Sequence, residues 1–163
     1  MGIFFLLAGI LAIQSAGTPP STRPSISVTI STPSAVVKLG SELAIKMVIT
    51  NKSDHEMLLG KPAGKPGQGE FLNLIEVRDE HGNAVGKTKY YRQIRGEEFV
   101  DGGISVSVSS FRVKPGESVE EEVLVNKLYN IDKAGKYTIQ VQHDDPETKA
   151  LVKSNTITVI VTP

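Results

Sequence analysis

The chain has 163 residues, a length that suits one domain with a sizeable hydrophobic core rather than two domains. Its 18 basic and 18 acidic residues cancel, so the overall charge does not draw the protein to nucleic acid or to an anionic membrane surface. The absence of cysteine excludes disulfide bonds, a thiol nucleophile and a lipidated cysteine anchor.

Residues 1–17, MGIFFLLAGILAIQSAG, predict a secretory signal peptide, although the usual basic residue before the apolar stretch is missing. The apolar stretch is shorter than the roughly 20 residues that cross a bilayer, and small residues follow it. We therefore expect a secreted or periplasmic protein without stable membrane insertion after cleavage. Residues 18–25, TPPSTRPS, predict a Pro/Ser/Thr-rich linker before one domain at 26–163.

Apolar side chains alternate with polar ones along much of 26–163, which predicts β-strands. The clearest strands lie at 26–31, 42–50, 71–78, 104–108, 119–125, 137–142 and 156–162. Between them, KPGE at 114–117 fits a type II turn, and DEHGN at 79–83 predicts a hairpin that returns through Ala84 and Val85. We expect an all-β, immunoglobulin-like antiparallel β-sandwich of about seven to nine strands, with no helix between them.

Two features depart from a minimal sandwich. The domain is longer than the roughly 100 residues of an immunoglobulin-like fold, and the surplus lies at 60–70 and 88–103. Glu121 falls on the apolar phase of its strand. Because an unpaired buried carboxylate costs several kcal/mol, we expect a bulge or an edge position there rather than a buried charge.

Asp132, Gly135 and Tyr137 have the spacing of a tyrosine corner, in which a buried tyrosine bonds the backbone a few residues upstream. Ile139 stands where antibody-like domains carry a disulfide cysteine. Burying such a side chain contributes about 1.5 to 3 kcal/mol, comparable with the roughly 2 to 4 kcal/mol of a disulfide. Aliphatic packing is therefore expected to replace the disulfide.

A family resemblance rests on three runs, LYNIDKAGKYTIQV, KLGSELAIKMVITNKSD and VKSNTITVIVTP. They resemble a group of uncharacterised exported bacterial proteins with an immunoglobulin-like fold. More loosely, they are similar to the propeptide domain that precedes deuterolysin-type zinc peptidases. The likeness covers most of 26–163 and implies a fold but no catalytic residue, and the HExxH zinc motif of such peptidases does not occur in the sequence.

No motif for catalysis stands out, since no serine lies in a GxSxG turn, so we expect no enzyme activity, no cofactor and no metal. His55 with Met57 would suit copper. Asp144, Asp145 and Glu147 would suit calcium, although an exposed acidic hairpin loop is the simpler interpretation. Separately, NKS at 51–53 matches a glycosylation sequon.

The segment KTKYYRQIR at 87–95 holds the candidate binding residues Tyr90, Tyr91, Arg92 and Arg95, because tyrosine and arginine are enriched at binding hot spots. In the alternative interpretation, Tyr90 and Ile94 pack onto a sheet.

The sequence thus predicts a non-catalytic exported domain that binds a protein or a surface glycan through its loops. One alternative is an inhibitor or pro-region-like partner of a secreted peptidase, which would need a protruding loop at 60–70 or 88–103. A second alternative is a periplasmic metal-binding protein, based on His55 and Met57.

Overall fold

A computed structural model describes residues 23–62, 73–103 and 108–163. The predicted signal peptide, most of the predicted linker, most of the loop at 60–70 and all but the last residue of the predicted strand at 104–108 lie outside the described residues.

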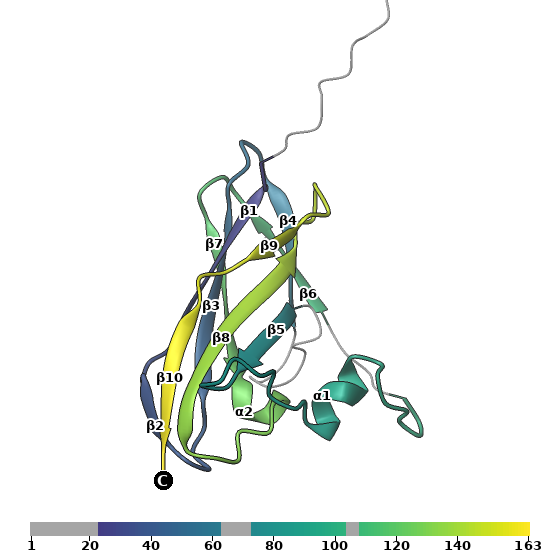
Figure 1. Ribbon diagram of the computed structural model, residues 1–163. Coiled ribbons are helices and arrows are strands. Elements are labelled where there is room, and N and C mark those ends of the chain that lie inside the picture. Colours follow the sequence, from purple (N-terminus) through teal and green to yellow (C-terminus); the bar gives the residue numbers. More distant parts are fainter. Residues whose placement is uncertain (1–22, 63–72, 104–107) are drawn as a thin grey trace, which may run out of the picture.

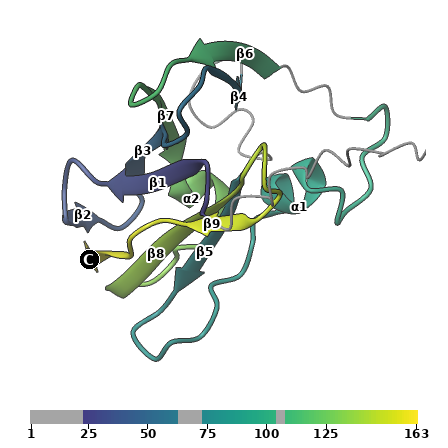
Figure 2. The ribbon, with the colours of Figure 1, turned by 90° about the horizontal axis from the view of Figure 1, so that it is seen from above.

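Two β-sheets lie face to face (Figures 1 and 2). One sheet has the strand order β1-β3-β7 and consists of β1 (Ile26–Ser31), β3 (Ala44–Asn51) and β7 (Ser118–Leu124). The other has the order β2-β10-β8-β5 and consists of β2 (Val36–Lys38), β10 (Ile157–Thr162), β8 (Gly135–Asp144) and β5 (Asn73–Arg78), with β9 (Leu151–Lys153) paired to the end of β8. A separate two-stranded ribbon joins β4 (Met57–Pro62) to β6 (Val108–Val113).

The alternating apolar side chains of both sheets point inward and form one core. All strand pairs are antiparallel except β2 with β10, so the N-terminal segment crosses from one sheet to the other between β1 and β2. The predicted all-β, immunoglobulin-like sandwich is confirmed. Its buried side chains include Ile26, Val28, Ile45, Met47, Ile49, Ile75, Val77, Val123, Ile139, Val141, Val159 and Val161.

The described residues contain ten strands and two short helices, α1 (Lys89–Ile94) and α2 (Val125–Leu128). The expectation of about seven to nine strands missed β2, β4 and β9, since none of them shows a clear apolar-polar alternation, and the strand predicted at 104–108 overlaps β6 only at Val108. The expectation of no helix was wrong. A helix of one or two turns is too short to show a 3.6-residue stripe in the sequence, so pattern alone does not find it.

The predicted turns hold in part. At 114–117, Gly116 has φ +81° and the Glu117 N–H donates to the Lys114 carbonyl at 3.0 Å, as a type II turn requires. The hairpin after β5 returns only briefly, through a single bridge between Arg78 and Ala84 and a hydrogen bond from the Val85 N–H to the Val77 carbonyl at 2.9 Å.

Glu121 lies on β7, an edge strand among the described residues, as expected, but it is buried, with 9% of its surface exposed. No bulge occurs there, because Glu121 pairs in regular register with Met47. Its carboxyl group lies in a polar cluster between the sheets: the buried Asn73 donates Nδ2 to Glu121 Oε2 at 3.3 Å, and Asn73 Oδ1 lies 2.7 Å from His143 Nδ1. Burial lowers the pKa of His143, an effect only partly offset by Asp144 and Asp145.

The tyrosine corner pins the long crossover into β8. Tyr137 is buried, and its hydroxyl donates to the carbonyl of Lys133 at 2.9 Å, which is the hydrogen bond that defines such a corner. Burial, followed by the negative charge of Asp132, raises the pKa of this phenol. Two residues further on, Ile139 has no exposed surface and fills the interior at the position discussed for a disulfide cysteine.

The buried side chain of Asn51, at the end of β3, links two neighbouring segments through hydrogen bonds. Its Nδ2 donates to the carbonyls of His55 and Val113, each at 2.8 Å, while its Oδ1 accepts from the backbone and the hydroxyl of Ser53. The side chain therefore joins the β3–β4 turn to β6.

Candidate binding surface

A short helical segment is mounted beside the edge of the sandwich at β5 (Figure 1). Thr88 begins helix α1 as its N-cap, since its Oγ1 accepts from the Tyr91 N–H at 3.1 Å. The same hydroxyl donates to the Lys127 carbonyl at 2.7 Å, and the Thr88 N–H donates to the Leu128 carbonyl at 2.8 Å. These bonds attach the start of α1 to helix α2.

Tyr91, predicted as a binding residue, lies in the core with no exposed surface. Its hydroxyl is 3.5 Å from both the Ile75 N–H nitrogen and the Asn73 carbonyl of β5. Its ring packs against that of Tyr129, with centroids 5.5 Å apart and a tilt of 57°. Tyr91 is therefore not accessible to a partner in this structure, because one turn of helix directs a single member of the YYR run inward and the sequence analysis expected no helix here.

Tyr90 and Arg92 are only partly accessible. Tyr90 and Ile94 are half-buried against the core, as the alternative interpretation of the segment expected. Arg92 turns back on its own segment, donating from Nη1 to the Lys87 carbonyl at 2.6 Å and from Nε to Glu98 at 2.9 Å. Of the four predicted binding residues, Arg95 is the one that is exposed.

Residues 95–103 form an arm that extends away from the sheets in both ribbon views (Figures 1 and 2). Gly96, with φ +70°, ends α1 and starts the arm, and Gly102 and Gly103 end it with φ values of +81° and +76°. Phe99, within the arm, is 87% exposed. The sequence analysis did not single out Phe99, although an isolated aromatic in the polar run GEEFVDGG was the available signal.

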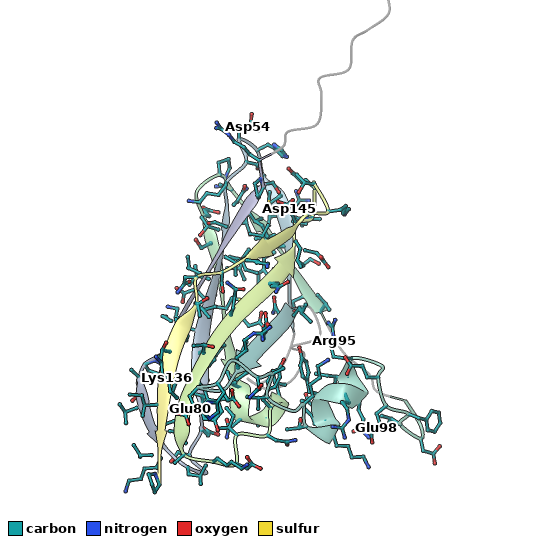
Figure 3. The ribbon with its side chains drawn as sticks, viewed as in Figure 1. Asp54, Glu80, Arg95, Glu98, Lys136 and Asp145 are labelled. Carbon is teal, nitrogen blue, oxygen red and sulfur yellow. The ribbon has the colours of Figure 1, made fainter. Side chains whose placement is uncertain are left out.

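Charged side chains of both signs surround the arm, including Arg95 and Glu98 (Figure 3). Lys87 pairs with Glu97 at 2.5 Å and Lys89 lies 3.9 Å from Glu98. Exposed pairs of this kind contribute only about 0 to 1 kcal/mol each, so they hold the arm loosely and leave its charges available to a partner.

At the opposite end of the sandwich, where Figure 3 labels Asp145, carboxylate groups bond segments that lie far apart in the sequence. Asp145 is buried and accepts from Ser25 N at 2.5 Å, Ser25 Oγ at 2.6 Å and the backbone N–H groups of Glu147 and Thr148 at 3.0 Å. Burial would raise the pKa of Asp145, but these hydrogen bonds outweigh it and lower the pKa to about 2. The carboxylate thus ties the start of β1 to the β8–β9 hairpin.

His55 adds a second link at this end. Its ring nitrogens lie 2.9 Å from Asp54 and 2.6 Å from Glu147, and these hydrogen bonds raise its pKa. Met57, its expected copper co-ligand, is buried in the core instead. Within the described ranges, no group of three or more His, Cys, Asp or Glu side chains is placed to hold a metal ion.

Two shallow hollows flank the crossover loop before β8. One, of about 420 Å³, lies toward β2 and Leu43, and the other, of about 480 Å³, lies toward the turn after β5. They share Asn130 and Asp132 in their walls. Because both are open rather than enclosed, they would cover little of a small molecule and are weaker candidate sites than the arm.

Comparisons with known proteins do not assign a family. No family model matches the chain, and no curated protein matches it in sequence. The likeness to exported bacterial proteins and to peptidase propeptides therefore stays a prediction. In the part of the chain that the structure describes, no helix is long and apolar enough to cross a membrane.

Among solved structures, the CARDB domain of a Pyrococcus furiosus protein is similar over 85% of this chain and 95% of its own, at 13% identity and a TM-score of 0.43. A β-glucosidase from Erythrobacter marinus matches 85% of this chain with 16% of its own, at 12% identity and a TM-score of 0.43. BslA, described as a bacterial hydrophobin, matches 85% of this chain with 96% of its own, at 13% identity and a TM-score of 0.35. At these values the likenesses add no argument about function.

Proposed function

We propose that this chain is a non-catalytic binding domain that recognises a protein partner through the arm at 95–103. The observation that carries the proposal is Phe99, which is 87% exposed on a segment that projects from the sandwich. A large aromatic side chain on a protruding segment contributes apolar contact area when a partner covers it, and aromatic and arginine side chains are enriched among the residues that dominate binding energies at protein interfaces. Arg95 supplies the arginine.

A protein partner fits the arm better than a glycan. Phe99 brings apolar area without a hydroxyl or an indole N–H to bond sugar hydroxyl groups. The charged side chains around it, Arg95, Glu97 and Glu98, form the polar rim that commonly surrounds an apolar anchor in protein interfaces. The rigid attachment of α1 through Thr88 keeps the base of the arm preorganised, which lowers the entropy cost of binding.

The test begins with a photo-reactive phenylalanine analogue at position 99 and, as a control, at position 58, where Leu58 is exposed on the distant β4–β6 ribbon. The partner cross-linked from position 99 alone is identified by mass spectrometry and purified. Phe99→Ala should then weaken its affinity by about thirtyfold or more, the loss typical of a hot spot, while Leu58→Ala changes it little. Equal affinity of Phe99→Ala and wild type, or binding to a glycan array without any protein cross-link, contradicts the proposal.

A second candidate function is inhibition of a secreted peptidase, favoured by one observation: the arm protrudes, as an inhibitory loop must. Here the purified domain is assayed against a panel of extracellular serine peptidases and metallopeptidases. Inhibition that is lost in Phe99→Ala supports this function, and full peptidase activity across the panel removes it. A metal-binding function has no comparable support, because Met57 is buried away from solvent.

The proposed partner lies outside the cytoplasm, an inference that rests on residues 1–17. Expression in a bacterium followed by mass spectrometry of the protein recovered from outside the cytoplasm should give a mature chain that starts at Thr18. Recovery of an intact chain beginning at Met1 from the cytoplasm overturns this inference.

A further inference from the structure

The edge of the larger sheet at β5 is covered in two ways: the backbone of Val85 and Ala84 pairs with Val77 and Arg78, and side chains cover Asn73 and Ile75. Among the described residues, β5 pairs with β8 on one side and ends the sheet on the other. The backbone groups of Asn73, Ile75 and Val77 face that open side, since the Val77 carbonyl accepts from Val85 there. In an open sheet edge these groups would form a template for pairing with a strand from another molecule.

Two tyrosine hydroxyls occupy the positions of the missing strand. The Tyr91 hydroxyl accepts from the Ile75 N–H and donates to the Asn73 carbonyl, at 3.5 Å in each case. The Tyr129 hydroxyl donates to the Ile75 carbonyl. A phenol hydroxyl can donate and accept at the same time, so two side chains satisfy backbone groups that a neighbouring strand would otherwise bond.

The two tyrosines are held as a unit. Their rings pack against one another, and the Lys87 ammonium lies 5.6 Å from the centroid of the Tyr91 ring. Burial raises the pKa of the Tyr129 hydroxyl, so it remains a donor across the accessible pH range. The short helices α1 and α2 carry or flank these rings and are joined through Thr88, so the cover is part of the folded domain rather than a mobile strap.

We propose that the Tyr91–Tyr129 pair is an edge guard, which prevents the β5 edge from pairing with the β5 edge of a second copy of this chain. The sequence of β5 is suited to such pairing. An antiparallel pair over Asn73 to Ile75, the part of the edge that Val85 leaves unpaired, would place Asn73 opposite the second copy's Ile75 and Leu74 opposite the second copy's Leu74, so no like charges would meet. Ile75 and Val77 would keep facing the core on both copies.

The test compares wild type with the double variant Tyr91→Phe/Tyr129→Phe, which keeps both rings and removes only the hydroxyl groups. Tyr137→Phe is the matched control, since it removes a tyrosine-to-backbone hydrogen bond away from β5. Hydrogen exchange of the Ile75 amide should become about tenfold faster in the double variant, consistent with the loss of one hydrogen bond. Sedimentation velocity should show a larger dimer fraction in the double variant than in wild type and in the control, because the unbonded groups of Asn73 and Ile75 then favour a strand that displaces the two rings.

A second measurement fixes the register and does not depend on the amount of dimer. The chain has no cysteine, so Leu74→Cys and Glu76→Cys can be introduced separately into the double variant and each protein placed under mild oxidation. A disulfide-linked dimer is expected from Leu74→Cys, because position 74 would lie opposite itself, and none is expected from Glu76→Cys. Monomeric double variant with unchanged Ile75 exchange, or equal dimerisation of Tyr137→Phe, overturns the proposal.

Discussion

Both ends of the sandwich are held together by side-chain hydrogen bonds to the backbone, but the side chains that make these bonds differ. At the end near the crossover and α2, tyrosine hydroxyls bond backbone carbonyls, as Tyr129 does at Ile75 and Tyr137 at Lys133. At the other end, the carboxylate of Asp145 bonds the backbone of Ser25 and of its own hairpin. Both join segments far apart in the sequence without a disulfide. The hydrogen bonds of the tyrosine hydroxyls should therefore not respond to acidification, whereas those at the other end depend on the negative charge of Asp145.

The largest effect is expected at the tyrosine end, from Tyr91→Ala. Removing a fully buried aromatic side chain costs about 3 to 5 kcal/mol, because the cavity does not collapse completely. Urea unfolding should give the same loss at mildly acidic and at neutral pH, since no charge is removed. The control is Tyr90→Ala, at a half-buried neighbour, which should cost clearly less. A loss that varies strongly with pH would break the comparison.

Asp145→Ala should produce the next largest effect and a different pH response. The pKa of Asp145 is lowered from 3.8 to about 2 in the folded protein, so ionisation contributes about 2 kcal/mol of stability at neutral pH. This contribution is fully present above about pH 4 and is lost as the pH falls through the folded pKa.

Acid unfolding followed by circular dichroism measures this difference. Wild type and Asp145→Ala should converge in stability toward the acid end of the titration. Asp144→Ala, which removes the exposed neighbouring carboxylate, should unfold like wild type. If Asp145→Ala and Asp144→Ala behave alike, the buried carboxylate does not hold this end together.

Tyr137→Phe should cost about 1 kcal/mol, because it removes one hydrogen bond and leaves the ring in place. Thermal unfolding at neutral pH should show a small decrease in the midpoint, and the decrease should not change on acidification. A loss as large as that of Tyr91→Ala would mean that the corner bond, rather than ring packing, dominates this end.

The smallest effect is expected from His55→Gln at the carboxylate end. The pKa of His55 is raised from 6.5 by its hydrogen bonds to Asp54 and Glu147, so its contribution is fully present below the unfolded pKa. It is lost as the pH rises through the folded pKa. Thermal midpoints of wild type and His55→Gln should differ below pH 6.5 and merge at higher pH. The control is His81→Gln, at an exposed turn residue, which should change the midpoint little. Midpoints that differ only at high pH would contradict the assigned sign.

Local patterns predicted the parts of the fold that local chemistry determines. Alternation located β1, β3, β8 and β10, and the Asp132–Tyr137 spacing anticipated the burial of the phenol. The hairpin through Ala84 and Val85 was overestimated, because its return path gives way to the segment that leads into α1.

The contacts that the sequence did not reveal join residues far apart. Tyr91 faces inward, where its ring packs against Tyr129 and its hydroxyl lies 3.5 Å from backbone groups of Asn73 and Ile75. Glu121 is buried because Asn73, from the opposite sheet, lies within hydrogen-bond distance. His55 meets Glu147 across 92 positions of the chain. Periodicity carries no information about such pairs, so they appear only once the topology is known.

The buried amide of Asn51 also bears on how the protein is produced. Both hydrogens of its Nδ2 are engaged by carbonyl oxygens inside the fold, so the sequon at 51–53 offers no acceptor nitrogen once the domain has folded. A sugar attached earlier, during synthesis in a eukaryotic secretory pathway, would have to occupy space that β6 and the β3–β4 turn fill. Material from a bacterial host avoids this competition between glycan transfer and chain folding.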